Sequence, residues 1–122
     1  MVLTITMAVL ADVAPLLGDN ISASFTDTMM DSVGLMAEAA ICNMVRYDAV
    51  TNWALIGAVE KVMMTEYVAR SIALAGISYD MSVFTTRLEA EDMMNIHIWR
   101  LRAIEKLLID QKTVTFIQGG TP

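Results

Sequence analysis

The sequence predicts an all-α protein: a small helical bundle around a long central helix, with short extended N- and C-terminal segments. Apolar residues recur at intervals of three and four over most of the chain, which is the pattern of helices with one buried face. Alternation with a period of two is confined to residues 2–7 and 113–118. A length of 122 residues suits one domain with a single core.

The start of the chain predicts a short strand-like segment followed by a brief helix. β-Branched residues alternate with other apolar residues from Val2 to Met7, as in a strand. The helix is expected to begin near Asp12, with Pro15 in its first turn, and to end at Gly18.

The second predicted helix begins at Thr26 or Asp27, either of which is suited to cap it, and runs to about Arg46. The helical spacing places Asp31 and Glu38 on its solvated side. Its predicted buried stripe comprises Met29, Met30, Val33, Met36, Ala37, Ala40, Ile41, Met44 and Val45.

Two small residues of this helix carry separate expectations. Gly34 costs up to about 1 kcal/mol relative to alanine, which suggests that a neighbouring backbone passes close to it. Cys42 is expected to pack as a small buried hydrophobe, because only Arg46 lies near enough in sequence to lower the pKa of its thiol. A single cysteine also fits a reducing compartment.

The central helix is predicted to run from Asp48 to Gly76, with Asp48, Thr51 and Asn52 as alternative caps. Apolar residues cover most of its circumference, which is typical of a buried helix; they are Trp53, Leu55, Ile56, Val59, Val62, Met63, Met64, Tyr67, Ala69, Ile72 and Leu74. The narrow solvated strip comprises Glu60, Lys61, Glu66 and Arg70.

The last helix is predicted to follow an irregular connection over residues 77–82. Thr86 and Glu89 form a capping box at its start, and it should end near Asp110. Basic residues between Arg100 and Lys112 are interpreted as favouring the negative end of its dipole. Its packing face comprises Met93, Met94, Ile98, Leu101, Ile104, Leu107 and Leu108.

An extended arm is predicted over residues 113–122, after a helical domain over residues 1–112. Val114 and Phe116 lie on one side of this arm and Ile117 on the other. An isolated strand is unstable in water, so the arm either pairs with the N-terminal strand or, as we favour, lies on a partner protein.

Composition favours a protein-binding role over the other classes. Hydrophobic residues make up 56% of the chain, more than its own core needs, yet no run reaches the roughly 20 residues that span a bilayer. The N-terminal run has no basic residue, so no signal peptide is expected. A net charge of -6 argues against gripping nucleic-acid phosphates. The apolar surplus is therefore expected to face another chain.

No constellation of residues predicts an enzyme, a metal site or a cofactor. His97 is the single histidine, and no second histidine gives it metalloenzyme spacing. We interpret it as a partly buried or interface residue; the alternative, that His97 and a methionine are axial haem ligands, is left open. No glycine-rich phosphate loop is present, since the glycine pair near the end precedes neither a lysine nor a helix.

A series of short segments, in order along most of the chain, carries a resemblance to a known family. These segments are Val9 to Val13 with Leu16 and Leu17, Ala37 to Ala39 with Ile41, Arg46 and Tyr47, Ile77 to Met81, Thr85 to Arg87, and Glu89 to Glu91. The most telling of them is the tyrosine-aspartate connection before the glutamate-rich helix start. In these segments the chain resembles the small head-to-tail adaptor (connector, or head-completion) proteins of tailed bacteriophages.

The resemblance implies a structural virion protein made in the host cytoplasm and placed in the neck. A ring of about twelve copies would lie under the portal protein, contact a downstream neck or tail protein, and extend the channel through which DNA passes without specific binding. No membrane is involved. The implied partner-binding residues are Tyr79, Asp80, Val114, Phe116, Ile117 and Gln118. A cytoplasmic helical interaction module that forms a small homo-oligomer remains the alternative.

Overall fold

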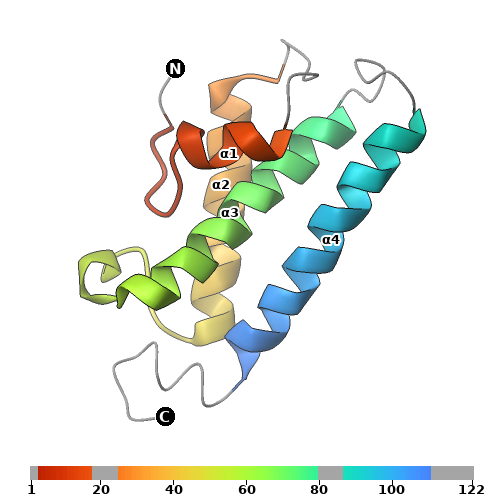
Figure 1. The fold of residues 1–122 in the computed structure, drawn as a ribbon. Helices are drawn as coiled ribbons and strands as arrows, with labels where there is room; N and C mark the ends of the chain where they lie inside the picture. Colours follow the sequence, from red (N-terminus) through yellow and green to blue (C-terminus); the bar gives the residue numbers. More distant parts are fainter. Residues whose placement is uncertain (1–2, 18–24, 80–86, 111–122) are drawn as a thin grey trace.

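The computed structural model describes residues 3–17, 25–79 and 87–110, and it confirms the all-α prediction. These residues form four α-helices and one 3-10 turn, and they contain no strand (Figure 1). The elements are α1 (Leu10–Leu17), α2 (Asp27–Val45), η1 (Trp53–Leu55), α3 (Ala58–Tyr79) and α4 (Arg87–Ile109). None of the described helices combines the length and apolarity needed to cross a lipid bilayer.

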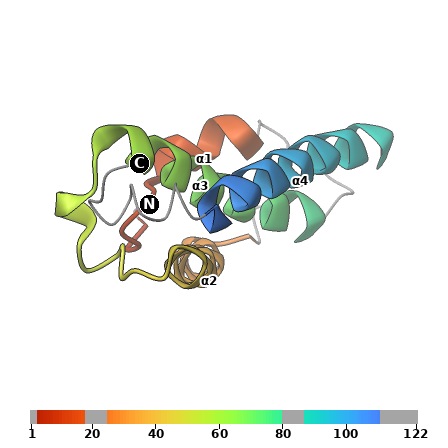
Figure 2. The ribbon, with the colours of Figure 1, turned by 90° about the horizontal axis from the view of Figure 1, so that it is seen from below.

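Helix α3 is the centre of the bundle, as predicted, because it packs against α1, α2 and α4. Figure 2 shows α1 and α2 on opposite sides of α3, with α4 beside it. Its middle supplies fully buried side chains, among them Met64, Val68 and Ile72. The apolar circumference of this stretch is therefore explained by neighbours on three sides.

The predicted start of the central helix at Asp48 is wrong by ten residues, because the chain first makes a turn. The Asp48 carboxylate accepts hydrogen bonds from the Thr51 backbone N–H and hydroxyl, at 3.1 and 2.7 Å. The backbone hydrogen bond from Thr51 is the largest cause of the lowered pKa of Asp48. After η1, Ile56 is extended (ψ 139°), so α3 begins only at Ala58.

The predicted end of this helix at Gly76 is also wrong, since α3 continues to Tyr79. Gly76 instead allows close packing of neighbouring segments against α3. A Cβ atom at Gly76 would lie 2.8 Å from Leu17 Cδ2 and 2.9 Å from Phe25 Cε2. The missing side chain therefore lets the end of α1 and the residues before α2 approach α3 closely.

Helix α2 has the predicted limits. The Thr26 side chain caps its start by accepting a hydrogen bond from the Met29 N–H at 3.4 Å, and Arg46 ends it in the left-handed conformation (φ 54°). Its carboxylates, however, are not on a solvated side: Glu38 is buried and Asp31 is half-buried. Both bind the N-terminal segment, residues 3–8.

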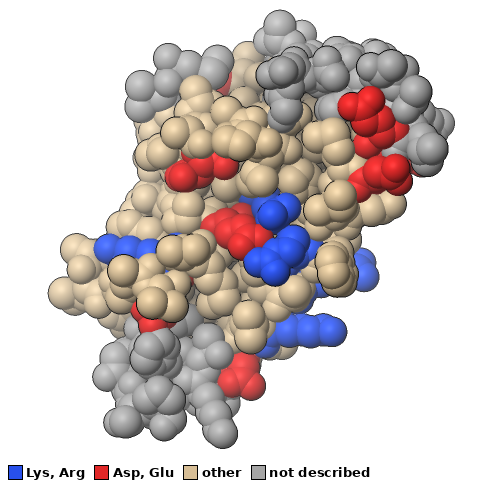
Figure 3. All heavy atoms as spheres, viewed as in Figure 1, with Lys and Arg blue, Asp and Glu red and all other residues tan. Residues whose placement is uncertain are grey.

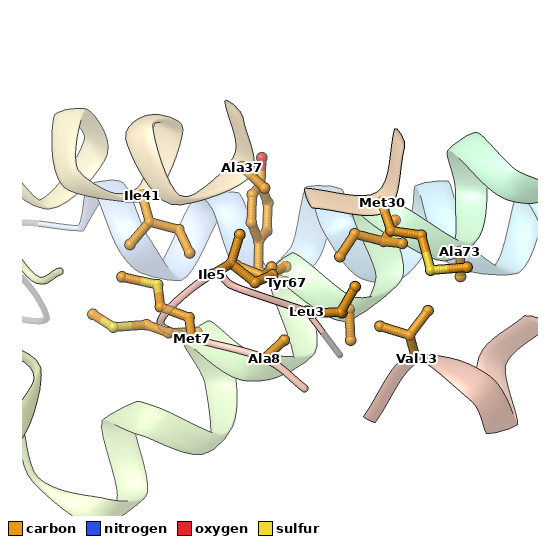
Figure 4. Packing of buried hydrophobic residues seen from close by; sticks show 14 of the residues in the cluster. Leu3, Ile5, Met7, Ala8, Val13, Met30, Ala37, Ile41, Tyr67 and Ala73 are labelled. Atoms are coloured by element: carbon orange, nitrogen blue, oxygen red, sulfur yellow. The ribbon is translucent and has the colours of Figure 1, made fainter. Parts of the chain in front are cut away.

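The N-terminal segment forms no strand but keeps the predicted alternation. Leu3, Ile5 and Met7 are buried, and Figure 4 shows Ile5 and Met7 beside Ala37 and Ile41 of α2. The alternation therefore reflects packing of single side chains into the core rather than pairing with another strand.

Backbone hydrogen bonds of the N-terminal segment go to side chains of two helices. Glu38 Oε2 accepts from the Thr6 N–H at 2.8 Å and the Met7 N–H at 2.6 Å. Asp31 accepts from the backbone N–H and hydroxyl of Thr4, both at 2.9 Å. The Thr65 hydroxyl of α3 donates to the Met7 carbonyl at 2.7 Å.

Gly34 lies under this segment. A Cβ atom there would lie 2.6 Å from Ile5 Cδ1 and 3.3 Å from Ile72 Cδ1. The expectation that a neighbouring backbone passes close to Gly34 is therefore wrong, because its nearest neighbours are the side chains of Ile5 and Ile72.

Helix α1 begins at Leu10, two residues before the predicted start, and Asp12 accepts a hydrogen bond from the Val9 N–H at 2.9 Å. Pro15 is consequently past the first turn, in contrast to the prediction. It removes one helical N–H donor. The carbonyl that loses this donor belongs to Ala11, which is exposed.

Candidate functional site

Most of the residues predicted to bind a partner lie outside the described part of the chain. Asp80, Val114, Phe116, Ile117 and Gln118 are in residues 80–86 and 111–122, so their roles stay predictions. Whether residues 113–118 form an extended arm lies outside it for the same reason.

Tyr79 is the one residue of that set which the structure describes. It is the last residue of α3 and 47% exposed, and its ring centroid lies 5.8 Å from that of buried Phe25. The ring therefore packs against Phe25 and remains partly exposed. Its role in binding a partner stays a prediction.

Exposed apolar side chains of η1 and of the first turns of α3 form a first candidate surface, which we call the α3 patch: Leu55, Val59 and Val62. These side chains are 79, 78 and 69% exposed, although the sequence analysis counted them among the residues of a buried helix. That expectation was wrong, because the turn before Ala58 carries η1 and the beginning of α3 to the edge of the bundle (Figure 1).

Two charged residues next to the α3 patch in the sequence contact other residues of the domain. Glu60 is buried and folds over Gly57, where a side chain would collide with its carboxylate. The Lys61 ammonium lies 5.2 Å from the centroid of the Trp53 ring, within the range of a cation–π contact. The prediction that Glu60 and Lys61 lie in a solvated strip is therefore wrong. The α3 patch itself contains no charged residue.

The outer side of α4 forms a second candidate surface, the α4 stripe: Ile96, Trp99, Ala103 and Leu107. Their spacing of three and four places them on one face. Ile96, Trp99 and Leu107 are 56, 74 and 53% exposed. The predicted packing face of this helix included Leu107, which was wrong, but Ile104 and Leu108 are buried as predicted. A sequence signal for the stripe existed, since Trp99 falls opposite these buried residues at helical spacing.

A third exposed apolar group lies on α2. Met29, Leu35 and Met36 are exposed, and the first and last of these were predicted to be buried. The two inward-facing carboxylates account for the difference: the helix is rotated so that Asp31 and Glu38 reach the N-terminal segment. Methionine side chains adapt readily to irregular partners, so this face can also contact another protein.

A chain of polar contacts ties α1, α3 and α4 together. Glu66 accepts two hydrogen bonds from Arg100, both at 2.7 Å, and one from Arg70 Nε at 2.7 Å. Figure 3 shows acidic and basic side chains in contact near the centre of this face. Hydrogen bonding from Arg100 is the largest cause of the lowered pKa of Glu66. Glu66, Arg70 and Arg100 are thus part of the α3–α4 contact.

His97 lies at the buried end of this series of polar contacts. Its burial agrees with the interpretation of His97 as a partly buried residue. Arg70 Nη1 lies 3.0 Å from His97 Nδ1, and His97 Nε2 lies 3.1 Å from the Leu16 carbonyl. Because arginine only donates and a carbonyl only accepts, the neutral ring carries its proton on Nε2. Both ring nitrogens are therefore engaged within the protein, which argues against a haem ligand.

Burial is the largest cause of the lowered pKa of His97, the Leu16 hydrogen bond opposes it, and Arg70 lowers it further. We predict that the free energy of unfolding falls on acidification. A depressed histidine pKa contributes stability that is complete above the unfolded value of about 6.5 and is lost as the pH falls through the folded value. Denaturant unfolding at pH 7.5 and 5.5 measures the loss. The His97→Gln variant has no titrating ring at this position, so its free energy of unfolding should depend less on pH. An equal loss in the variant and the unaltered protein would contradict the prediction.

Other chemistry is sparse in the described residues. Cys42 is half-buried rather than fully buried, at the edge of an open hollow with Asn43, Arg46, Tyr47 and Asp48. Among residues 3–17, 25–79 and 87–110, no three His, Cys, Asp or Glu side chains are grouped so that they could hold a metal ion.

Tyr67 is a further buried polar contact between α3 and α4. Its hydroxyl donates to Glu105 at 2.9 Å, and burial followed by this carboxylate raises the pKa of Tyr67. The polar groups between these helices therefore satisfy one another and hold the two helices together.

Candidate surfaces among the described residues thus include the α3 patch, the α4 stripe, the exposed face of α2 and Tyr79. No family model, curated protein or solved structure matches the chain.

Proposed function

We propose that this chain is a head-to-tail adaptor of a tailed bacteriophage, a structural virion protein without catalytic activity that forms a ring in the neck beneath the portal. One observation carries the proposal: a domain of this size completes its own core and still exposes large apolar side chains on α2, α3 and α4. Extensive exposed apolar surface is typical of subunits that are buried in an assembly.

Two further features support the adaptor class. The sequence resembles these proteins over most of its length, including the connection that begins at Tyr79. The net charge of -6 suits a channel wall past which DNA slides without being held by its phosphates.

We predict that deletion of residues 113–122 leaves the helix content unchanged but abolishes binding to the portal protein. The deleted segment contains Val114, Phe116 and Ile117, the apolar side chains proposed to lie on the partner. Circular dichroism reports the helices, and co-sedimentation with portal rings reports binding. Substitution of Thr113 alone by serine is the matched control, and undiminished binding of the shortened chain would refute this role of the arm.

A cytoplasmic module that forms a small closed oligomer is the second candidate, because the same exposed apolar side chains would suit it. The native mass separates the two. A ring of about twelve copies, or density for the chain beneath the portal in electron micrographs of virions, supports the adaptor. A dimer that also fails to bind portal rings supports the module.

A further inference from the structure

His97 joins α4 to both α1 and α3 through its two ring nitrogens. The residue is 4% exposed, and its Nε2 donates a hydrogen bond to the Leu16 carbonyl of α1 at 3.1 Å. Its Nδ1 accepts a hydrogen bond from Arg70 Nη1 of α3 at 3.0 Å. One donating and one accepting nitrogen is the arrangement of a neutral imidazole, so these two contacts suit His97 only while it is uncharged.

A second proton on His97 is incompatible with Arg70 in this position. The proton must bind Nδ1, because Nε2 already carries one. It would then point at an N–H group of the guanidinium, and two cations would lie 3.0 Å apart inside the domain. Like charges repel strongly at such a distance where water is scarce. One of the two side chains therefore has to move when Nδ1 takes up a proton.

Arg70 is the side chain that can move. His97 is buried and is held to α1 through Leu16, whereas the Arg70 side chain is 18% exposed and has a long flexible stem. Arg70 Nε donates to Glu66 Oε2 at 2.7 Å, so its guanidinium connects the carboxylate to the imidazole. Rotation of Arg70 toward the solvent would leave Glu66 as the nearest acceptor in this series of contacts.

We infer that protonation of His97 expels Arg70 from its place between α3 and α4, and that Glu66 then accepts the hydrogen bond from Nδ1. The same residues thus have two arrangements, which differ by one proton taken up from the solvent. In the neutral arrangement Arg70 binds both Glu66 and His97. In the protonated arrangement His97 binds Glu66 directly, and the guanidinium of Arg70 is exposed.

Glu66 is suited to this exchange because it keeps its negative charge under mildly acidic conditions. Its pKa is lowered, and hydrogen bonding from Arg100 is the largest cause. Arg100 binds both carboxylate oxygens at 2.7 Å, so the departure of Arg70 still leaves Glu66 a bidentate partner. An ordinary glutamate has a pKa of about 4.3, so Glu66 remains ionised at pH 5.

The other described carboxylates on the elements around His97 are engaged elsewhere. Asp12, the carboxylate of α1, accepts a hydrogen bond from a backbone N–H at the start of its own helix. The inward-facing carboxylates of α2 bind the N-terminal segment. Glu105 of α4 accepts from the Tyr67 hydroxyl. Glu66 is therefore the described carboxylate that a protonated His97 reaches by displacing a single side chain.

NMR spectroscopy of the full chain tests the displacement of Arg70. The Arg70 Nε–H should be protected from exchange with water at pH 7.5, and its protection relative to free arginine should fall at least about 10-fold at pH 5.0. Arg100 Nε–H is the internal control and should stay protected, because its hydrogen bond to Glu66 is kept. In the His97→Gln variant no ring takes up a proton, so Arg70 should stay protected at both pH values.

Two matched substitutions test the conflict between the charges. A glutamine amide can either donate to Nδ1 or accept from it, so Arg70→Gln removes the conflict. This variant should shift the midpoint of the His97 ring titration upward, toward about 6.5. Arg100→Gln is the same change in the other partner of Glu66 and should shift the midpoint less.

A crystal structure at pH 5.0 should show a Glu66 oxygen about 3 Å from His97 Nδ1, with Arg70 turned outward. Three results would overturn the inference: equal protection of Arg70 at both pH values while His97 titrates, equal midpoints in the two glutamine variants, or a His97 that stays neutral until the chain unfolds. The isolated chain is the sample throughout, so these results are independent of the adaptor role.

Discussion

Replacing Glu38 by alanine should destabilise the protein by about 2–4 kcal/mol. The substitution removes one carboxylate oxygen that accepts two backbone hydrogen bonds, from Thr6 and Met7, and the Met7 bond is buried. Two donors would then lack a partner, and the loss of the buried Met7 bond costs more than the loss of an exposed bond. Urea denaturation followed by circular dichroism measures the change.

Asp31→Ala is the matched control for this prediction. Asp31 lies two turns earlier on the same helix and also binds the N-terminal segment through two hydrogen bonds, but those bonds are exposed. Water can replace the carboxylate there, so a cost of about 1 kcal/mol or less is expected. Equal losses at the two positions would show that the burial of Glu38 contributes nothing.

Ile72→Ala should cost about 2–5 kcal/mol, the usual range for truncating a buried isoleucine. Ile72 is fully buried in the middle of α3, and its Cδ1 lies against Gly34 of α2. Because typical stabilities are about 5–15 kcal/mol, this single change can remove a large share of the total. Differential scanning calorimetry reads the loss as a lower Tm.

Ile96→Ala makes the same chemical change on the exposed face of α4, where the side chain is 56% exposed. A loss below about 0.5 kcal/mol is expected, because little of the side chain leaves a packed environment. A comparable fall in Tm for both variants would contradict the assignment of Ile72 to the core.

The sequence predicted the helical class, the capped start of α2 at Thr26 and the central position of α3, because each depends on local features. Apolar spacing and capping residues act within a few positions of each other. The limits of α2 were right for this reason. The start of α3 was wrong because Thr51 binds Asp48 in a turn that competes with the helix, and capping residues suit either structure.

The rotation of α2 could not be read from its sequence. The periodicity of α2 predicted an apolar inner face and placed Asp31 and Glu38 on the solvated side. The alternation in the N-terminal segment predicted a strand separate from this helix. The outcome depends on donors some thirty residues earlier, since Glu38 and Met7 are 31 positions apart. The α3 patch and the exposed face of α2 were missed for the same reason: the segments that pack on a helix decide which of its apolar residues remain exposed.

The N-terminal segment has a consequence for the order of folding. Met7 leaves the ribosome before Thr65, yet its carbonyl accepts a hydrogen bond from the Thr65 hydroxyl, 58 positions later in the chain. Closing so long a loop is slow compared with forming a helix, and nascent chains grow by about 5–20 residues per second. The N-terminal segment therefore waits several seconds after its own synthesis for the helices that receive it.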